Sequence, residues 1–242
     1  MSAVGTIVDL WRFPVKSMLG ERLDTVHVEA DGVVGDRAFV VVDVATGEVA
    51  SAGRPRRWAD LLRCRAAFLA PPAPGRPLPP ARLELGDGTV VRSDDADVDD
   101  ALSRFVGRPV RLAAAEPNPF PVSLLTTASL RHMRDLVPAG DWDVRRFRMN
   151  VTVETPEPGL VENGWVRSGL ALGSDAAVAV GQPTARCVMI GLPVEELPPD
   201  RTLLKAVATH NRVGREPCLG VYARVARSGQ VRVGDAVTSA RS

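Results

Sequence analysis

The sequence is short of the residues that build disulfide frameworks and zinc sites. Its 242 residues include three cysteines (Cys64, Cys187 and Cys218) and three widely separated histidines. The odd number of cysteines and the lack of a CxxC pair argue against a disulfide framework and against a zinc finger. This cysteine usage fits a protein that works in a reducing compartment.

Excess charge and long apolar runs are also lacking. The formal net charge is +1, which gives no overall attraction for nucleic acid or for an anionic membrane. No stretch approaches the roughly 18 apolar residues of a membrane span, and residues 1–17 lack the pattern of a secretion signal. We therefore expect a cytoplasmic protein with no nucleic-acid or membrane partner, in which any anion site is built from a local cluster of basic residues.

Lysine is scarce as well, because only Lys16 and Lys205 are lysines among the 30 basic residues. An ammonium is a compact point charge, whereas a guanidinium is a planar fork. Lys16 and Ser17 follow Phe13-Pro14-Val15, at the end of an expected strand, and offer an ammonium, a hydroxyl and free backbone donors. Such a turn suits a phosphate or a polar heterocycle. A solvated lysine in a loop is the alternative interpretation.

The hydrophobic pattern predicts many short strands with a few small helices. Strands are expected over 4–11, 23–29, 38–44, 66–69, 149–154, 176–180, 219–225 and 231–233. Helices are expected over 56–62, from the acidic run 94–100 to a stop at Gly107, after a cap at Thr126 or Thr127, and over 203–211. The predicted fold is mainly β with short helices (α+β), of the barrel or sandwich kind, without a βαβ-wound sheet.

Two proline-rich segments interrupt this pattern. Residues 71–80 contain six prolines, which lack the backbone donor and fix φ, so the segment is predicted to be an exposed connection. A ligand for a proline-recognition partner is the alternative. Residues 116–121 mark the expected domain boundary, which divides the chain into residues 1–115 and 116–242.

Cys187 is the residue with the most informative setting. It follows an apolar strand and the cation of Arg186, and a neighbouring cation favours the thiolate, which binds soft metals or attacks electrophiles. The alternative is that Cys187 is a small buried hydrophobic residue.

Further basic residues stand at strand ends. Arg37 follows Gly35-Asp36 and could fork onto a phosphate or a pterin carbonyl, although an internal Asp36–Arg37 turn is the alternative. Residues 145–150 are expected to enter a strand, where alternation would place Arg146, Arg148 and Asn150 on one face and Phe147 and Met149 on the other. Two guanidiniums and an amide on one face would bind an anion and a heterocycle, whereas an arginine run is otherwise a solvated face.

In this order, the motifs resemble those of the MOSC family, named for the C-terminal domain of molybdenum cofactor sulfurase. The chain is most similar to the group with an added N-terminal β domain, which includes the mitochondrial amidoxime reducing component and its bacterial relatives. The resemblance runs from about residue 4 to residue 237 and rests on these segments: Phe13–Ser17, Asp36-Arg37, Phe147–Asn150, Arg186-Cys187 and Val233–Val237. It implies an N-terminal β-barrel-like domain packed on a MOSC β-barrel domain.

The resemblance also implies a molybdenum cofactor, in which a pyranopterin dithiolene and one protein thiolate hold the metal. By position, Cys187 would be the molybdenum ligand and the catalytic residue. The residues implied to hold the pterin and its phosphate are Lys16, Ser17, Arg37, Arg148, Asn150, Arg186 and Tyr222, the last being the only tyrosine and otherwise a packing residue. Pyridoxal phosphate is not an expected cofactor.

The implied activity is the reduction of small N-hydroxylated or N-oxide compounds. The chain has no additional cysteines for an iron–sulfur centre, so a separate electron-donor protein is expected. Three alternatives stay open: a non-catalytic module that stores or delivers the cofactor, a sulfur carrier that holds a persulfide on Cys187, and a β-barrel protein with an unrelated ligand.

Overall fold

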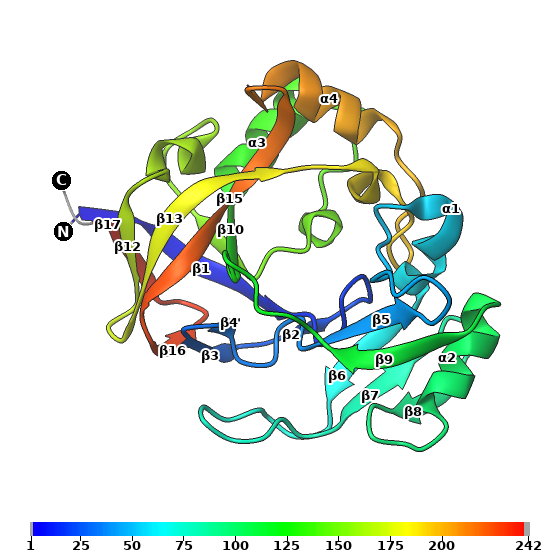
Figure 1. Cartoon of the computed structure of the whole chain (residues 1–242). Coiled ribbons are helices and arrows are strands. Elements are labelled where there is room, and N and C mark those ends of the chain that lie inside the picture. The colour runs from blue at the N-terminus through cyan, green and yellow to red at the C-terminus, as the bar shows by residue number, and fades with distance from the viewer. Residues whose placement is uncertain (1, 240–242) are drawn as a thin grey trace.

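Seven strands close into a β-barrel in the computed structural model, which describes residues 2–239 (Figure 1). Around the barrel the strands are β10 (Val122–Thr126), β11 (Val151–Glu154), β1 (Ser2–Arg12), β17 (Ala236–Ser239), β12 (Gly169–Leu172), β13 (Ala176–Ala185) and β15 (Glu216–Arg227). The antiparallel pairing of β10 with β15 closes the ring. A short strand, β14 (Arg212–Val213), extends β15 as a hairpin.

Alternating apolar residues fill the barrel. Val122 and Leu124 of β10, with Val151 and Val153 of β11, belong to one buried cluster that every barrel strand supplies. The residues between them face outward, and Leu125 packs in a second cluster under the helices. The alternation of apolar residues from which the strands were predicted therefore also indicates which side chains point into the barrel and which point out.

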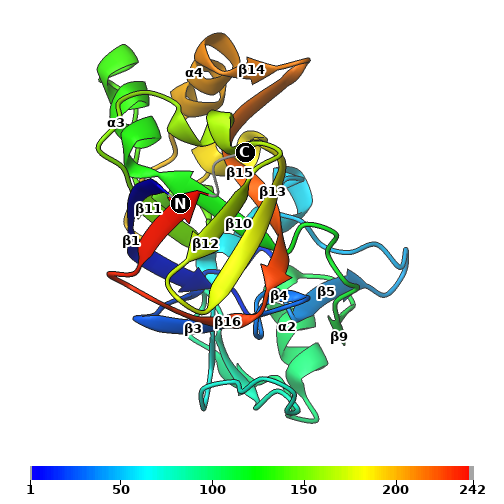
Figure 2. The same cartoon turned by 90° about the vertical axis from the view of Figure 1, so that its left-hand side faces the viewer.

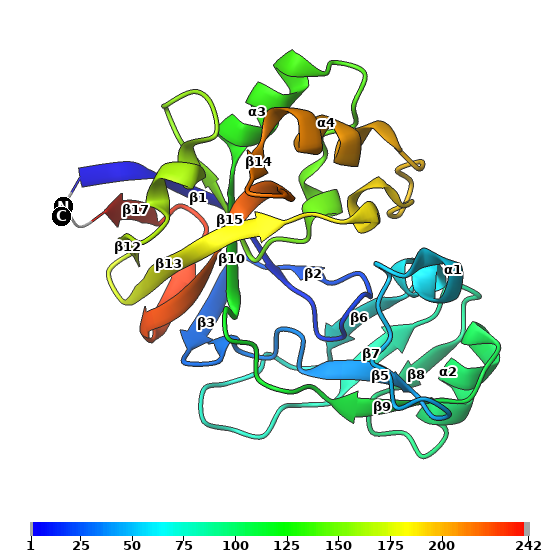
Figure 3. The ribbon, with the colours of Figure 1, turned by 45° about the horizontal axis from the view of Figure 1, so that its top comes forward.

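Two helices cover the outside of the barrel, where they lie next to each other (Figure 3). The helix α3 (Thr127–Leu136) is capped by Thr126, whose hydroxyl accepts a hydrogen bond from Ser129 N, as expected for a cap. The helix α4 (Thr202–His210) agrees with the predicted helix. Because β10 and β11 are parallel and α3 connects them, the barrel contains one βαβ unit among otherwise antiparallel pairs.

The N-terminal part of the chain has its own core around Trp58 and Leu61. Its strands pair as β5 (Phe39–Asp43) with β9 (Val110–Ala114), and as β6 (Arg65–Phe68), β7 (Ala81–Glu84) and β8 (Val90–Arg92) in a second sheet. Its helices are α1 (Pro55–Trp58), the 3₁₀ helix η1 (Ala59–Arg63) and α2 (Val98–Val106). The predicted stop at Gly107 is confirmed, since that residue caps α2 in the left-handed region with φ 71°.

The two parts of the sequence are interleaved in space. β1 lies between β11 and β17, although it comes first in the chain. In a three-stranded sheet below the barrel, β16 (Gly229–Arg232) pairs with β3 (Thr25–Glu29), which pairs with β4 (Gly32–Val33) (Figure 2). The short strand β2 (Glu21–Arg22) pairs with the end of β1. The predicted mainly-β fold class is confirmed, while the boundary at 115/116 stays a prediction.

The prediction that residues 145–150 enter a strand is wrong. Residues Val144–Phe147 form the 3₁₀ helix η2, which Asp143 caps by accepting from Arg145 N, and β11 begins only at Val151. The expected alternation of faces is absent, because residues 146–150 are all buried. Arg146 turns inward and pairs with Asp141, with Nη2 2.6 Å from the carboxylate.

Residues 71–80 contain neither helix nor strand, as their prolines predicted. Among residues 2–239, none of the helices has the length and apolarity needed to cross a bilayer.

A buried carboxyl group ties the barrel to the elements around it. Glu162 lies on the 3₁₀ helix η3 (Val161–Trp165) and is 1% exposed. It accepts hydrogen bonds from Thr126 Oγ1 (2.7 Å), Ser129 Oγ (2.6 Å) and Gly220 N (3.1 Å). Burial raises its pKa in spite of these donors.

We predict that Glu162→Gln changes the pH dependence of stability. A raised carboxyl pKa gives stability that is fully present below the ordinary value near 4.5 and lost as the pH rises through the raised pKa. The free energy of unfolding of the variant, relative to that of the parent, should therefore be higher at pH 7.5 than at pH 4.5, which means that the variant is relatively more stable at the higher pH. Urea unfolding at both pH values measures this, with Glu84→Gln, at a half-exposed side chain, as the control. An identical difference at both pH values would contradict the prediction.

Candidate functional site

Cys187 is exposed, in contrast to the buried Cys64 and Cys218. It lies just after β13, at the start of the 3₁₀ helix η4 (Val188–Gly191). Gly53, which precedes α1, lies so close that a Cβ atom on it would be 3.4 Å from the Cys187 Sγ atom. The interpretation of Cys187 as a small buried hydrophobic residue is therefore wrong, and the thiol lies at the seam between the barrel and the N-terminal part.

The loop after β1 approaches this seam. The Lys16 backbone N–H donates to the Phe39 carbonyl at 2.9 Å, and Ser17 Oγ accepts from Ala52 N at 3.1 Å, one residue before Gly53. The predicted hydroxyl of Ser17 thus holds the segment that contacts the thiol. Lys16 is exposed, as the alternative interpretation of a solvated lysine expects, but partial burial, followed by the charges of Arg37 and Arg54, lowers the pKa of its ammonium. The ammonium therefore lies in positively charged surroundings, which an anion would relieve.

Arg37 connects the N-terminal part to the barrel. Its Nη1 pairs with Asp36, and its Nη2 donates to the Arg148 carbonyl at 3.0 Å. Asp36 also accepts from Phe13 N at 2.7 Å. The Asp36–Arg37 turn that was the alternative interpretation is present, and it orients Arg37 toward Arg148.

Arg148 is buried with an unsatisfied donor. Its Nη1 has no hydrogen-bond partner within residues 2–239, and its Cζ lies 4.3 Å from the Phe13 ring centroid. Arg37 Cζ lies 5.1 Å from the same ring. Burial and the nearby Arg37 lower the pKa of Arg148, while Asp36 opposes this effect. A buried cation with an orphan N–H is costly, so this position is suited to a ligand that brings an acceptor.

Backbone strain concentrates at the same residues. Ser17, Arg37 and Arg148 have φ values of 68°, 50° and 53°, in the left-handed region that residues other than glycine rarely adopt. Within the described chain only two further non-glycine residues, Arg167 and Glu195, share this conformation. Such strain persists where the surroundings fix it and is concentrated at functional sites.

Arg186 fixes the segment that carries the thiol. Its guanidinium donates to the Leu219 carbonyl at 2.8 Å and to the Phe147 carbonyl at 2.9 Å. Burial lowers its pKa to about 10, an effect that Tyr222 and then Glu162 oppose. Since these donors are directed at the protein backbone, Arg186 holds Cys187 and Arg148 in a fixed relation.

Asn150 directly precedes β11 and Tyr222 lies on β15, the two strands that flank β10. Asn150 Oδ1 accepts from Ser123 N (3.1 Å) and Ser123 Oγ (2.8 Å), and its amide donates to the Trp11 carbonyl at 3.3 Å. Tyr222 is half-buried and pairs with Ser123 in the sheet. The structure thus brings Asn150 to the barrel wall with its polar atoms engaged by the protein, and its role toward a cofactor stays a prediction.

Two residues of the site were missed by sequence reasoning. Asp36 orients Arg37. Its place directly before Arg37 is visible in the sequence, but there it indicated only a local turn and not a part of the site. Gly53 lies near the thiol although 134 positions separate it from Cys187, since a Cβ atom on it would be 3.4 Å from Sγ. No local pattern could have shown this approach.

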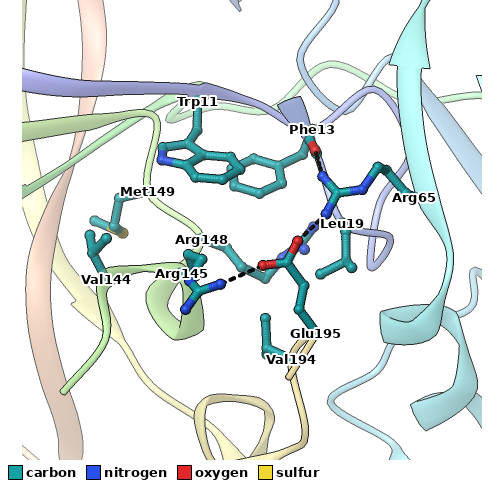
Figure 4. Close-up of a pocket in the computed structure, with 11 residues that line it drawn as sticks. Trp11, Phe13, Leu19, Arg65, Val144, Arg145, Arg148, Met149, Val194 and Glu195 are labelled. Carbon is teal, nitrogen blue, oxygen red and sulfur yellow. Dashed lines mark hydrogen bonds and ion pairs between the residues drawn. The ribbon is translucent and has the colours of Figure 1, made fainter. Parts of the chain in front are cut away.

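A pocket continues from Arg148 along the seam (Figure 4). It is lined by Trp11, Phe13, Leu19, Gly20, Arg65, Val144, Arg145, Arg148, Met149, Val194 and Glu195. The Trp11 and Phe13 rings stack with centroids 6.0 Å apart. Glu195 pairs with Arg65 from the N-terminal part and with Arg145 from the barrel side at 2.7 Å.

The residues present fit a molybdenum cofactor. The exposed thiol is a soft ligand, and the orphan Nη1 of Arg148 and the ammonium of Lys16 suit the anionic and carbonyl groups of a pterin phosphate. Within the described residues, no group of three or more histidine, cysteine or acidic side chains is arranged to hold a metal ion. One thiol supplies one ligand, so the other ligands of a metal at Cys187 would come from a cofactor.

The fold and site define a class of protein in which a closed β-barrel, joined to an N-terminal β domain, presents a single exposed thiol beside buried arginines. The chain belongs to the MOSC-domain family: the MOSC domain matches residues 113–238, and the MOSC N-terminal beta barrel domain matches residues 4–66. The predicted resemblance to MOSC proteins with an N-terminal β domain is thereby confirmed. No curated protein matches the chain significantly.

One of the similar solved structures has a TM-score above 0.5 and shares the fold. The YuaD protein from Bacillus subtilis is similar with a TM-score of 0.54 and 15% identity, over 97% of this chain and 94% of that chain. YiiM from Geobacillus stearothermophilus has a TM-score of 0.36 and 18% identity, and YiiM from Escherichia coli has 0.37 and 14%. The YiiM matches cover 50% and 52% of this chain and 54% and 58% of theirs, so the chain matches little more than half the length of either YiiM.

We predict that Asp36→Asn destabilises the site. The substitution leaves Arg37 and Arg148 without the one carboxylate that opposes their charges, and breaking such a partly buried pair costs about 1–3 kcal/mol. Urea unfolding measures the free energy. Asp94→Asn, which breaks a half-exposed pair with Arg92, is the control and should have little effect. Equal effects of the two variants would show that Asp36 has no special role.

Proposed function

We propose that this protein binds a molybdenum cofactor at the seam, with Cys187 as the protein ligand of the metal. One observation carries the proposal: Arg186 connects an exposed thiol to a buried guanidinium that has no acceptor. Arg186 directly precedes Cys187, and it donates to the carbonyl of Phe147, which directly precedes Arg148. Membership of the MOSC-domain family supports it.

The residues at the seam would have different roles in binding the cofactor. Lys16, Arg37 and Arg148 would hold its anionic and carbonyl oxygens, with Ser17 ordering the loop beside them and Asn150 and Tyr222 in the adjoining barrel wall. Arg186 would orient the thiol. When bound, the cofactor would supply two-electron oxygen-atom transfer, and the protein keeps the groups around it fixed before binding.

We further propose that the protein is a reductase of small N-hydroxylated or N-oxide compounds. The overall reaction takes up two electrons and two protons, breaks the N–O bond, and gives the amine or amidine and water. A separate electron-donor protein would supply the electrons. We also propose a cytoplasmic location, where the exposed thiol would stay reduced.

Metal analysis tests the cofactor assignment. Protein made in a host that synthesises the cofactor should contain near-stoichiometric molybdenum, and Cys187→Ala should lose most of it. Cys64→Ala is the matched control, because burial raises the pKa of the Cys64 thiol to about 12, which makes it a poor ligand at neutral pH.

Molybdenum retained by Cys187→Ala would refute the assignment of the ligand. A persulfide mass on Cys187 in protein without molybdenum would identify a sulfur carrier instead.

Turnover tests the reductase assignment separately. Molybdenum-loaded protein with a chemical electron donor should reduce an N-hydroxylated amidine to the amidine, measured by chromatography, and Cys187→Ala should reduce it only at background rate. Loaded protein that gives no product would refute the reductase assignment and leave a cofactor carrier, which should release the cofactor to an apoenzyme.

A further inference from the structure

Three arginines are clustered on the surface next to the candidate metal ligand. Arg54, Arg56 and Arg57 are exposed and belong to α1 or to the residue that directly precedes it. They follow Gly53, on which a Cβ atom would be 3.4 Å from the Cys187 Sγ atom. Figure 1 shows α1 beside the turn that follows β13. The arginines and the exposed thiol are therefore neighbours on the surface.

One carboxylate opposes these charges only in part. Glu48 pairs with Arg54 and, at 3.7 Å, with Arg57, and the two guanidiniums remain 56% and 53% exposed. Arg56 makes no ion pair and no hydrogen bond within residues 2–239. Three guanidiniums and one carboxylate leave an excess of positive charge in one small area, while the whole chain has a formal net charge of only +1. The cluster is thus a local positive surface that attracts anionic groups before they make contact.

The cluster stands on a fixed part of the backbone. Pro55, at the start of α1, fixes its own φ, and Trp58 at the end of α1 is 1% exposed within the N-terminal core. The next acidic residue, Asp60, pairs with Arg63 and so does not neutralise the cluster. The helix α1 therefore presents the three arginines to solvent from a constant position beside the thiol.

An acidic protein matches this surface better than nucleic acid or a small anion. Nucleic-acid binding needs a larger basic surface, with exposed aromatic rings where single strands are bound, whereas the one aromatic ring of α1 is buried. A free small anion gains little from exposed arginines that stay solvated. A protein surface with several carboxylates interacts with all the charges at once, and opposite charges also speed and orient its approach.

We infer that Arg54, Arg56 and Arg57 form the docking surface for an electron-donor protein that presents carboxylates. The inference rests on the proposed function, because the two electrons of the proposed reaction have to reach a metal held by Cys187, and this surface adjoins that thiol. It adds the place of docking and the charge of the partner, which the proposed reaction leaves open.

Calorimetry with an acidic plant-type ferredoxin as the probe tests the docking surface. The ferredoxin should bind saturably at low salt to protein from a host that synthesises the cofactor, and more weakly at high salt, because salt screens exposed charges. Arg56→Glu combined with Arg57→Glu should weaken binding by about tenfold or more, since attractions become repulsions. Arg56→Lys combined with Arg57→Lys keeps both charges and should bind nearly as the parent does. A basic cytochrome c, the control probe, should not bind.

A matched pair of charge reversals controls for net charge. Arg104 of α2 and Arg134 of α3, like Arg56 and Arg57, are exposed basic residues in the last turns of their helices. Arg104→Glu combined with Arg134→Glu changes the net charge by the same amount and should change the affinity less than about twofold. Circular dichroism establishes that every variant is folded.

Turnover separates docking from catalysis. With an N-hydroxylated amidine as substrate, two ferredoxins that carry one electron each are oxidised for each N–O bond that is reduced. The variant with Arg56→Glu and Arg57→Glu should lose turnover at subsaturating ferredoxin in proportion to its loss of affinity. It should keep the parental rate with saturating dithionite, which needs no docking surface.

The inference and the proposed function fail in different ways. Protein that turns over with dithionite but does not bind ferredoxin, or binds it equally well in every variant, would overturn the inference alone. Salt-sensitive ferredoxin binding that the α1 reversals abolish, in protein that gives no turnover with dithionite, would retain the docking surface and refute the reductase assignment. A DNA oligonucleotide that binds more tightly than ferredoxin would assign the surface to nucleic acid and also overturn the inference.

Discussion

The continuation of β1 into the N-terminal part is the constraint on which the site depends. β1 is fixed within the barrel by β11 and β17. Directly after it, Phe13 N donates to Asp36 and Lys16 N donates to Phe39, so the same segment also anchors the N-terminal sheets. The thiol, the ammonium and the guanidiniums come from distant parts of the chain. They keep a fixed relation because β1 lies in the barrel and the segment that directly follows it is bound to the N-terminal part.

Positive charge is concentrated at the seam between the barrel and the N-terminal part, where hydrogen bonds fix the backbone around Arg148. The Phe147 and Arg148 carbonyls are each held by an arginine, Arg186 on one side and Arg37 on the other, which keeps Arg148 in its left-handed conformation. A strained and buried cation is unfavourable unless the rest of the fold over-determines it. An anion that binds only the folded state would stabilise it by mass action, so the strain favours a ligand that restores the charge balance.

The sequence predicted features that local interactions determine. The caps at Thr126 and Gly107 and the irregular proline segment depend on neighbouring residues, and the structure has them where expected. The prediction of a strand over residues 145–150 is wrong because Asp143 caps a 3₁₀ turn there and Asp141 pairs with the inward-turned Arg146, and an alternating pattern does not show either contact. The pairing of β1 with β17 and the approach of Gly53 to Cys187 are long-range, so no local window contains them.

The residues implied by the family resemblance divide into two physical groups. Asn150 and Arg186 direct their donors at the backbone of the protein, and each links segments that carry the site. Arg148 and Lys16 instead keep a cation without a carboxylate partner in the described residues. Loss of a residue in the first group would displace its neighbours, whereas loss of one in the second would remove an attraction for the ligand. Position in a motif therefore identifies the members of this site, but only the hydrogen bonds that each one already makes distinguish the residues that position from those that bind.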